Sequence, residues 1–349
     1  MSPTIKDVAQ KAGVALSTVS LVINRKSNVR QETKKRVENA IAELNYHPRR
    51  TARGLASQRT YNLGFILTED HFSQAEPFYT KIFLGSEIEA RKHHYYILLT
   101  TVQKNFRQGA PIPRFLLERN VDGVILAGKV SNGLIDFVQG MGLPLVMIDY
   151  TTPACKASTV LIDNYGGACA AVNQFIKEGH RDIAFVGGEA SHPSLSERLR
   201  GYKAALQDQG IPVRDALISN AEPYTGVDDG REATRKLLGT GVPFTAVFAS
   251  NDTMAVGVMR CLKEKNLTVP RDVSVIGFDD IEVCLQVEPC LSSVRVFKED
   301  LGAIAVRRIV EKIEDDRMMV NRVLVPVELV LRESTARAPQ QVIQRIVSG

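Results

Sequence analysis

The chain has 349 residues, 44% of them hydrophobic and 24% charged, a composition typical of a globular protein with two or three domains. The N-terminus has no apolar signal core, and no stretch approaches the roughly 18 uninterrupted apolar residues of a membrane span. A membrane protein is therefore excluded, and we expect a cytoplasmic one. The five cysteines have no C-x-x-C spacing and the six histidines have no metal-ligand spacing, so we expect no disulfide framework, no metal site and no cofactor.

Positive charge is concentrated at the start of the chain. Residues 1–60 contain twelve Lys and Arg against four Asp and Glu, a net charge of +8. The whole chain carries only +5, which leaves −3 for everything after residue 60. This asymmetry predicts a nucleic-acid-binding head on a near-neutral body.

Three short helices are predicted in the head. Thr4 and Asp7 form a capping pair ahead of apolar residues at helical spacing, and Gly13 then turns the chain. A second helix is predicted over about 16–24 and a third over about 31–45. Helix, glycine turn and short second helix form the helix-turn-helix pattern, although a three-helix bundle with a solvated basic face has the same spacing.

The residue identities narrow these alternatives. The segments that matter are Thr4–Ala9, Ala12–Val14, Ser17–Ser20, Val22–Asn24, Glu43–Tyr46 and Pro48. Together they closely resemble the DNA-binding head of the LacI/GalR family of bacterial transcription regulators, nearly continuously from residue 3 to about residue 60.

The resemblance implies two sets of contacts with operator DNA. The positions that bind phosphates, and so fix the register of the head, are Thr4, Thr18, Ser20, Asn24 and Tyr46. Arg30, which departs from the family pattern, is a further candidate for binding phosphate. The positions that face base edges in the major groove are Leu16, Ser17 and Leu21.

The head departs from the family pattern at three positions. Many members have an arginine where this chain has Leu21, and leucine cannot make the bidentate contact of arginine to guanine. We expect Leu21 to make an apolar contact instead, for example with a thymine methyl. Ala15 and Arg30 replace serine N-caps, so two helices lose caps worth about 1 kcal/mol each. Arg30 makes up for the lost cap if its side chain binds a DNA phosphate.

The segment after Pro48 is expected to be a hinge. Residues 51–57 are too few to form a helix alone, because isolated helices shorter than about 12 residues are marginal in water. We expect disorder in the absence of DNA. The resemblance implies that the segment becomes helical on operator DNA and that Leu55 wedges into the minor groove beside Ala52 and Arg53. The alternative is that Leu55 is a linker residue packed on the body.

From residue 61 onward, short apolar runs alternate with helical stretches. Strands are predicted over 63–67, 95–99, 123–126, 145–148, 183–186, 246–249 and 273–276, and helices over 82–92, 168–178, 199–209 and 253–265. Runs that are apolar on both faces fit parallel strands covered by helices, which predicts a doubly wound α/β architecture. The body is too large for one such sheet, so we expect two lobes with a cleft between them. Periodicity does not show how often the chain crosses between the lobes.

The body contains further family segments. They are Asn120–Gly123, Val160–Asn164, Glu178–Arg181, Ser250–Ala255 and Val275–Asp280. The resemblance extends to about residue 335 and implies a type I periplasmic-binding-protein fold whose lobes close on a small effector. It implies effector-binding roles for Phe78, Tyr79, Asp149, His192, Ser194, Arg198, Tyr224, Thr225, Asn251 and Asp279.

These residue types favour a sugar as the effector. Carboxylates beside Asn and Arg suit a polyhydroxylated ligand, because they accept from and donate to neighbouring hydroxyls. A purine is the alternative, since His192 and Ser194 match positions that select purines in one branch of the family. The family often has an aromatic platform where this chain has Thr225, and Tyr224 is one place away from it.

Some of these residues have a structural alternative. Asp279 can cap the turn that follows it, and Arg198 can be a surface residue paired with Glu197. We expect Asp163–Asn164 to be a capping pair for a helix that starts at Gly166, rather than a ligand site.

Three classes of function were compared. A transcription regulator, most simply a repressor, binds a pseudo-palindromic operator as a homodimer and responds to the effector. A transport-type solute-binding protein shares the body but has no use for a basic head. An enzyme is not expected, because G-x-x-x-x-G-K-[ST], G-x-G-x-x-G, G-x-S-x-G and H-E-x-x-H are absent from the sequence.

For a transcription regulator, we expect the chain to have four parts. These are a helix-turn-helix domain (1–47), a hinge (48–60), a two-lobed effector-binding and dimerisation domain (61–340) and a tail (341–349). The tail has no heptad repeat, so we expect a dimer and not a coiled-coil tetramer.

Overall fold

The computed structural model describes residues 3–23, 29–46, 59–69, 78–106, 109–153, 155–188, 192–222 and 225–339. Contacts divide the chain into two compact units, Met1–Tyr61 with Arg119–Asp122 and Asn62–Glu118 with Gly123–Gly349. Among the described helices, none combines the length and the apolar character that crossing a membrane requires.

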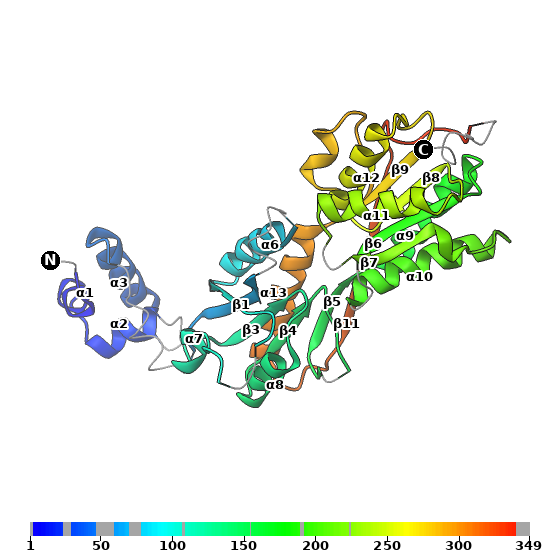
Figure 1. Ribbon diagram of the computed structural model, residues 1–349. Helices are drawn as coiled ribbons and strands as arrows, with labels where there is room; N and C mark the ends of the chain where they lie inside the picture. The colour runs from blue at the N-terminus through cyan, green and yellow to red at the C-terminus, as the bar shows by residue number, and fades with distance from the viewer. Residues whose placement is uncertain are drawn as a thin grey trace. The chain divides into compact units, whose positions relative to one another are not determined.

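The first unit contains a small helical domain made of α1 (Ile5–Ala12), α2 (Leu16–Ile23) and α3 (Gln31–Glu43). Its core is closed by Val8, Val19 and Val37, one from each helix and all fully buried. The three predicted helices are confirmed (Figure 1). The third ends two residues earlier than predicted, because Asn45 leaves the helical conformation at φ 48°.

Local sequence sets the ends of these helices. The backbone N–H and the hydroxyl of Thr4 both donate to Asp7 Oδ2 at 2.7 Å, which is the predicted capping pair. Gly13 ends α1 in the left-handed region at φ 63°, where a residue without a Cβ is unstrained. Arg30 precedes α3 and makes no side-chain cap hydrogen bond, as expected for a residue that replaces a serine cap.

The second unit consists of two lobes, each built on a six-stranded sheet. The first sheet has the strand order β11-β5-β4-β3-β1-β2 and the second β12-β10-β9-β8-β6-β7. All neighbouring strands in the described sheets are parallel except β10 and β12. The expected pair of doubly wound lobes is therefore present (Figure 1).

The first lobe contains β1 (Asn62–Thr68), β2 (Tyr96–Val102), β3 (Gly123–Ala127), β4 (Leu145–Ile148), β5 (Ser158–Ile162) and β11 (Arg322–Val325). Its helices are α6 (Phe78–Lys92), α7 (Arg114–Leu117), α8 (Asn132–Gly140) and α13 (Lys298–Glu314).

The second lobe contains β6 (Ile183–Gly188), β7 (Ile218–Glu222), β8 (Ala246–Ala249), β9 (Ser274–Asp279), β10 (Ser292–Val296) and β12 (Val327–Val330). Its helices are α9 (Asn164–Lys177), α10 (Pro193–Asp208), α11 (Val227–Gly239) and α12 (Asp252–Glu264), with short 3-10 turns η1 (Asp215–Leu217) and η2 (Glu282–Leu285).

The chain crosses between the lobes at three points in the described region. It leaves the first sheet after β5, returns after β10 to form α13 and β11, and crosses again between β11 and β12. This settles the number of crossings that periodicity had left open. Since all three crossings are short, the lobes are joined at one edge by three neighbouring segments.

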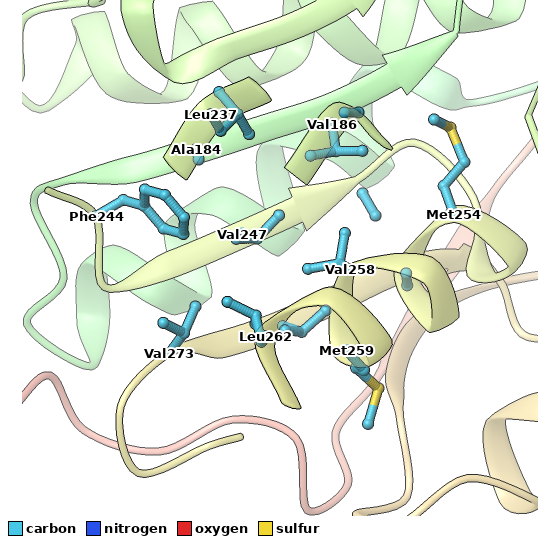
Figure 2. Close-up of a cluster of buried hydrophobic side chains, with 14 of the residues drawn as sticks. Ala184, Val186, Leu237, Phe244, Val247, Met254, Val258, Met259, Leu262 and Val273 are labelled. Carbon is cyan, nitrogen blue, oxygen red and sulfur yellow. The ribbon is translucent and has the colours of Figure 1, made fainter. Parts of the chain in front are cut away.

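Each lobe has an apolar core between its sheet and its helices. In the second lobe, Val186 and Val247 of the sheet share a cluster with Val258 and Leu262 of α12, all buried (Figure 2). Strands β6, β8 and β9 are buried on both faces. Because strands of this kind are apolar along their whole length, they could be predicted from the sequence as continuous apolar runs.

Several elements were not among those predicted. Strand β10 begins with two buried serines, Ser292 and Ser293, and β11 and β12 are only four residues long. A charged residue also lies within each of the three strands: Arg295 in β10, Arg322 in β11 and Glu328 in β12. The helix α13 was also missed, although it is 17 residues long.

Close contact between α6 and α13 generates a test of the fold. A Cβ added at Gly302 of α13 would lie on the backbone carbonyl of Ile82 in α6. We expect Gly302→Ala to lower the free energy of unfolding by about 2 kcal/mol or more, because the two backbones must separate. Gly140→Ala, at the end of α8, has nothing within 4 Å of the new Cβ and is expected to change stability by less than about 1 kcal/mol.

Urea denaturation of both variants measures the difference. Equal stability of Gly302→Ala and Gly140→Ala would contradict the close packing of the two helices.

Candidate functional site

The predicted base-reading residues lie on one side of α2. Leu16 is 44% exposed and Ser17 is also exposed, whereas Val19 and Val22 on the opposite side are buried in the head core. Leu21 is half-buried. The helix therefore presents a short uncharged surface to its surroundings.

The predicted phosphate-binding residues differ in burial. Thr4 and Arg30 are exposed, and Thr18 and Ser20 are half-buried. Tyr46 is 6% exposed and packs in the head core. Five of the predicted site residues lie outside the described part of the chain: Asn24, Ala52, Arg53, Leu55 and Tyr224.

In the second unit, the first predicted carboxylate is held from both lobes. Asp149 follows β4, is 6% exposed and has a left-handed backbone, φ 56°. The hydroxyl of Tyr79, in α6, donates to Asp149 Oδ2 at 3.0 Å. The hydroxyl of Ser194, in α10 of the second lobe, donates to Asp149 Oδ1 at 2.7 Å. Three predicted residues are thus brought together where the lobes meet.

His192 lies beside this group and has a defined hydrogen-bonding role. It is the N-cap of α10, and its Nδ1 accepts from the backbone N–H of Ser194 at 3.2 Å. Burial lowers the pKa of His192, against the opposing effect of the Asp149 charge. A neutral imidazole that accepts at Nδ1 carries its hydrogen on Nε2.

A second group is built around Arg198 of α10. Its Nε donates to Asn164 Oδ1 at 2.7 Å, its Nη1 to the carbonyl oxygen of Ser250 at 2.5 Å, and its Nη2 to Asp279 Oδ1 at 3.1 Å. The guanidinium also lies 3.7 Å from the centre of the Phe278 ring. Arg198 is 4% exposed, so it is a buried residue that connects α9, β8 and β9.

The structure decides the alternatives for Arg198 and for Asp163–Asn164. The proposal that Arg198 is a surface residue paired with Glu197 is wrong, because it is Arg200 that forms this ion pair, at 2.5 Å. Asp163 caps α9 as expected, accepting from Gly166 N–H at 2.9 Å, but the helix already begins at Asn164.

Asn251 and Thr225 are also in contact. Asn251 is the N-cap of α12, where its Oδ1 accepts from Met254 N–H at 2.8 Å. Its Nδ2 donates to the carbonyl oxygen of Thr225 at 3.1 Å. Phe78, the first residue of α6, is 6% exposed and packs edge-on against Tyr79 with ring centroids 5.1 Å apart.

Sequence reasoning missed a set of buried charges next to Asp279. Asp252 is fully buried and accepts from Ile281 N–H at 2.8 Å and from the Ser293 hydroxyl at 2.5 Å. Asp280 accepts from Arg295 Nε at 2.7 Å and Arg332 Nη2 at 2.6 Å. The sequence signal was the Asp279–Asp280 pair itself. Its basic partners, Arg295 in the unpredicted strand β10 and Arg332 just after β12, are distant in the sequence.

Three of the predicted effector residues share one kind of place in the fold. Asp149, Asn251 and Asp279 stand at the carboxyl ends of β4, β8 and β9, where open α/β sheets bind ligands. In the described part of the chain, no three His, Cys, Asp or Glu side chains are grouped so that they could hold a metal ion.

Comparison with known proteins identifies the two units. Residues 4–49 match the model of bacterial regulatory proteins of the lacI family, and residues 172–335 match that of the periplasmic binding protein-like domain. Catabolite control protein A of Priestia megaterium is 34% identical over 337 residues, which is 96% of this chain and 100% of that protein. The chain belongs to the LacI family of bacterial transcription regulators.

Two solved structures of transcription regulators agree with this assignment. The complex of the transcriptional regulator CelR with cellobiose has a TM-score of 0.73 and 32% identity, covering 95% of this chain and 99% of CelR. The lac repressor dimer bound to operator and the anti-inducer ONPF has a TM-score of 0.79 and 28% identity, covering 96% and 100%.

Family membership decides between the three classes of function. The protein is a ligand-responsive transcription regulator with a helix-turn-helix head and a periplasmic-binding-protein-like effector domain, and LacI-family regulators are not enzymes. The transport-type reading is wrong, because residues 4–49 are a regulator's DNA-binding domain.

The buried Asp252 predicts a particular pH dependence of stability. Burial, and next to it the charge of Asp279, raise the pKa of Asp252 from 3.8 to about 7. Between about pH 4 and 7 the folded protein holds a proton that the unfolded chain has released. The contribution of this group to the free energy of unfolding therefore falls as pH rises through that range.

We expect the Asp252→Asn variant to lose this fall in the free energy of unfolding with rising pH. The control variant Asp136→Asn, which changes an exposed residue of α8, should keep it. Urea denaturation of the three proteins at pH 5, 6, 7 and 8 gives the slopes. Parallel slopes for the parent and Asp252→Asn would show that Asp252 does not titrate in this range.

Proposed function

We propose that the protein is a repressor that binds a pseudo-palindromic operator as a homodimer and is controlled by an uncharged sugar bound between the lobes. The observation that carries this proposal is the pair of buried carboxylates, Asp149 and Asp279, at strand ends near the junction of the lobes. A regulator that acts on operator DNA works in the cytoplasm, as we expected from the sequence.

The hydrogen bonds of the site support a hydroxylated ligand. A carboxylate has about four acceptor positions, and Asp149 uses one on each oxygen for the Tyr79 and Ser194 hydroxyls. The remaining positions suit the vicinal hydroxyls of a sugar. A purine, which has few donors, would be recognised chiefly through ring stacking and edge contacts, and the Nε2–H of His192 is the group that supports this alternative.

The charges of the site support an uncharged ligand over an acidic one. Arg198 is already paired with Asp279, and its remaining contacts are to Asn164 and Ser250. The ammonium of Lys298 is bonded to the backbone carbonyls of Asp279, Asp280 and Val296. A carboxylate or phosphate on the ligand would have to displace these contacts while lying beside Asp149. That CelR binds cellobiose supports a sugar in this family.

We propose that the head makes the DNA contacts and that a hinge connects it to the effector domain. In this proposal, residues 1–47 bind DNA, 48–60 form the hinge, 61–340 bind effector and partner subunit, and 341–349 are a tail. Leu16, Ser17 and Leu21 face base edges from an uncharged helix, so we propose that apolar contacts contribute more to sequence recognition than in members with an arginine at position 21.

Dimerisation is supported by exposed apolar side chains of the first lobe. Leu84 and Ile88 are one turn apart on α6 and are both exposed. Tyr96 and Leu99 are exposed on β2, the edge strand that α6 contacts. The lac repressor, to which the chain is similar along 96% of its length, is a dimer on its operator. We propose that a second copy of this chain covers these side chains.

A thermal-shift screen tests the effector assignment. The probes are cellobiose, D-ribose and D-glucose as uncharged sugars, D-glucuronate as an acidic one, and guanine and hypoxanthine as purines. We expect an uncharged sugar to raise the melting temperature, since a ligand that binds only the folded state stabilises it. Asp149→Asn and Asp279→Asn should weaken binding about tenfold or more, while the exposed control Asp136→Asn should not.

The outcomes are distinct. A shift with purines alone would contradict the proposal of a sugar effector but not the proposed position of the effector site. A shift that is equal in the parent and both site variants would contradict the site.

A further inference from the structure

Lys298, at the start of α13, is a buried cation that sequence reasoning did not single out. It is 3% exposed, and its ammonium donates to the carbonyl oxygen of Asp279. It also lies 3.2 Å from the carbonyl oxygen of Val296 and 3.5 Å from that of Asp280. A lysine ammonium has three donors, so these three backbone oxygens account for all of them.

The turn that Lys298 contacts has an unusual backbone. Asp279 and Asp280 are consecutive residues with positive φ, at 104° and 50°. Residues other than glycine persist in such conformations only when their surroundings hold them there. Arg198 holds the Asp279 carboxylate, and Arg295 and Arg332 hold the Asp280 carboxylate.

Lys298 differs from these arginines because it belongs to the other lobe. Its helix packs against α6 and against β3, β4 and β5 of the first sheet. The residue follows directly on the crossing after β10, and its ammonium is 5.9 Å from the ring centroid of Phe78 in α6. The Asp279–Asp280 turn, in contrast, ends β9 of the second sheet.

We propose that Lys298 is a positioning residue: from the first lobe it fixes the left-handed Asp279–Asp280 turn of the second lobe, and so sets the place of the Asp279 carboxylate. Any motion that separates the lobes at this edge must either carry the turn along with α13 or break the hydrogen bonds of the buried ammonium to the carbonyls of Asp279 and Asp280. The latter is strongly unfavourable, so the turn stays with α13 and the lobes rotate about it. The importance of this for ligand binding rests on the proposed effector role of Asp279.

Hydrogen exchange in the ligand-free protein tests the proposal directly. The backbone N–H of Asp280 donates to the Ser293 hydroxyl at 3.1 Å, and that of Ile281 donates to Asp252 Oδ2 at 2.8 Å. Both amides report whether the turn is held. We expect Lys298→Met, which keeps the apolar stem, to speed exchange of a peptide covering 277–283 about tenfold or more.

A matched control comes from the same helix. Lys312 of α13 is partly exposed and pairs with Asp316 at 3.2 Å, so Lys312→Met removes the same charge and is expected to leave the 277–283 peptide unchanged. Lys298→Arg keeps a cation but cannot place one nitrogen among three carbonyls. Lys298→Arg should give a smaller increase in the exchange rate, confined to the 277–283 peptide. It replaces Lys298→Met in the experiment if that variant does not fold.

Exchange that stays at the parent rate in Lys298→Met would overturn the proposal. An increase spread evenly over both lobes, in whichever variant folds, would also overturn it, since it would make Lys298 a general stabiliser. Because no ligand is used, failure here is separate from failure of the effector assignment, which the thermal shifts of Asp279→Asn decide.

Discussion

The effector domain depends on one buried ion pair, Arg198 with Asp279. Removing two charges from water is costly, and the cost is met here by surrounding hydrogen bonds: Asn164 and Ser250 accept from the same guanidinium, and Phe278 lies against its face. Through its contacts, Arg198 links α9, α10 and the ends of β8 and β9. The charges of this surface are paired within the protein, and the proposed function therefore assigns it an uncharged, hydroxyl-rich ligand.

The connections between the lobes limit how the lobes can move relative to each other. Three crossings join the lobes at one edge, so we expect the lobes to open and close by rotating about that edge. Two contacts join the lobes. Ser194 of the second lobe donates to Asp149 of the first, and Lys298 of the first lobe contacts the Asp279–Asp280 turn beside the crossing after β10. In the proposed function, a ligand held by both carboxylates acts on the angle between the lobes.

The sequence predicted those parts of the fold whose local pattern matches their final burial. The central strands are apolar on both faces, and the head helices have clear caps and spacing, as Thr4 and Asp7 illustrate. Strand β10 was missed because its buried serines are satisfied by tertiary hydrogen bonds, such as that of Ser293 with Asp252. Burial of this kind depends on partners about 40 residues away in the chain, and no local pattern records it.

The candidate site shows the same division. Family resemblance named Asp149, Arg198 and Asp279, but the roles of Asn164, Asp252 and Lys298 follow only from the three-dimensional arrangement. A lysine at the start of a helix is ordinarily solvated. Lys298 is buried because the crossing after β10 places its ammonium on the Asp279–Asp280 turn of the second lobe.

The most direct measurement of the central claim is operator affinity with and without sugar, for the parent and for Arg198→Lys. Fluorescence anisotropy would use a duplex selected from random sequences by the parent, and the sugar that gives the largest thermal shift. We predict that sugar changes the operator Kd of the parent about tenfold or more, and that Arg198→Lys binds operator equally well but no longer responds to sugar. A response to sugar of the same size in Arg198→Lys would contradict the account.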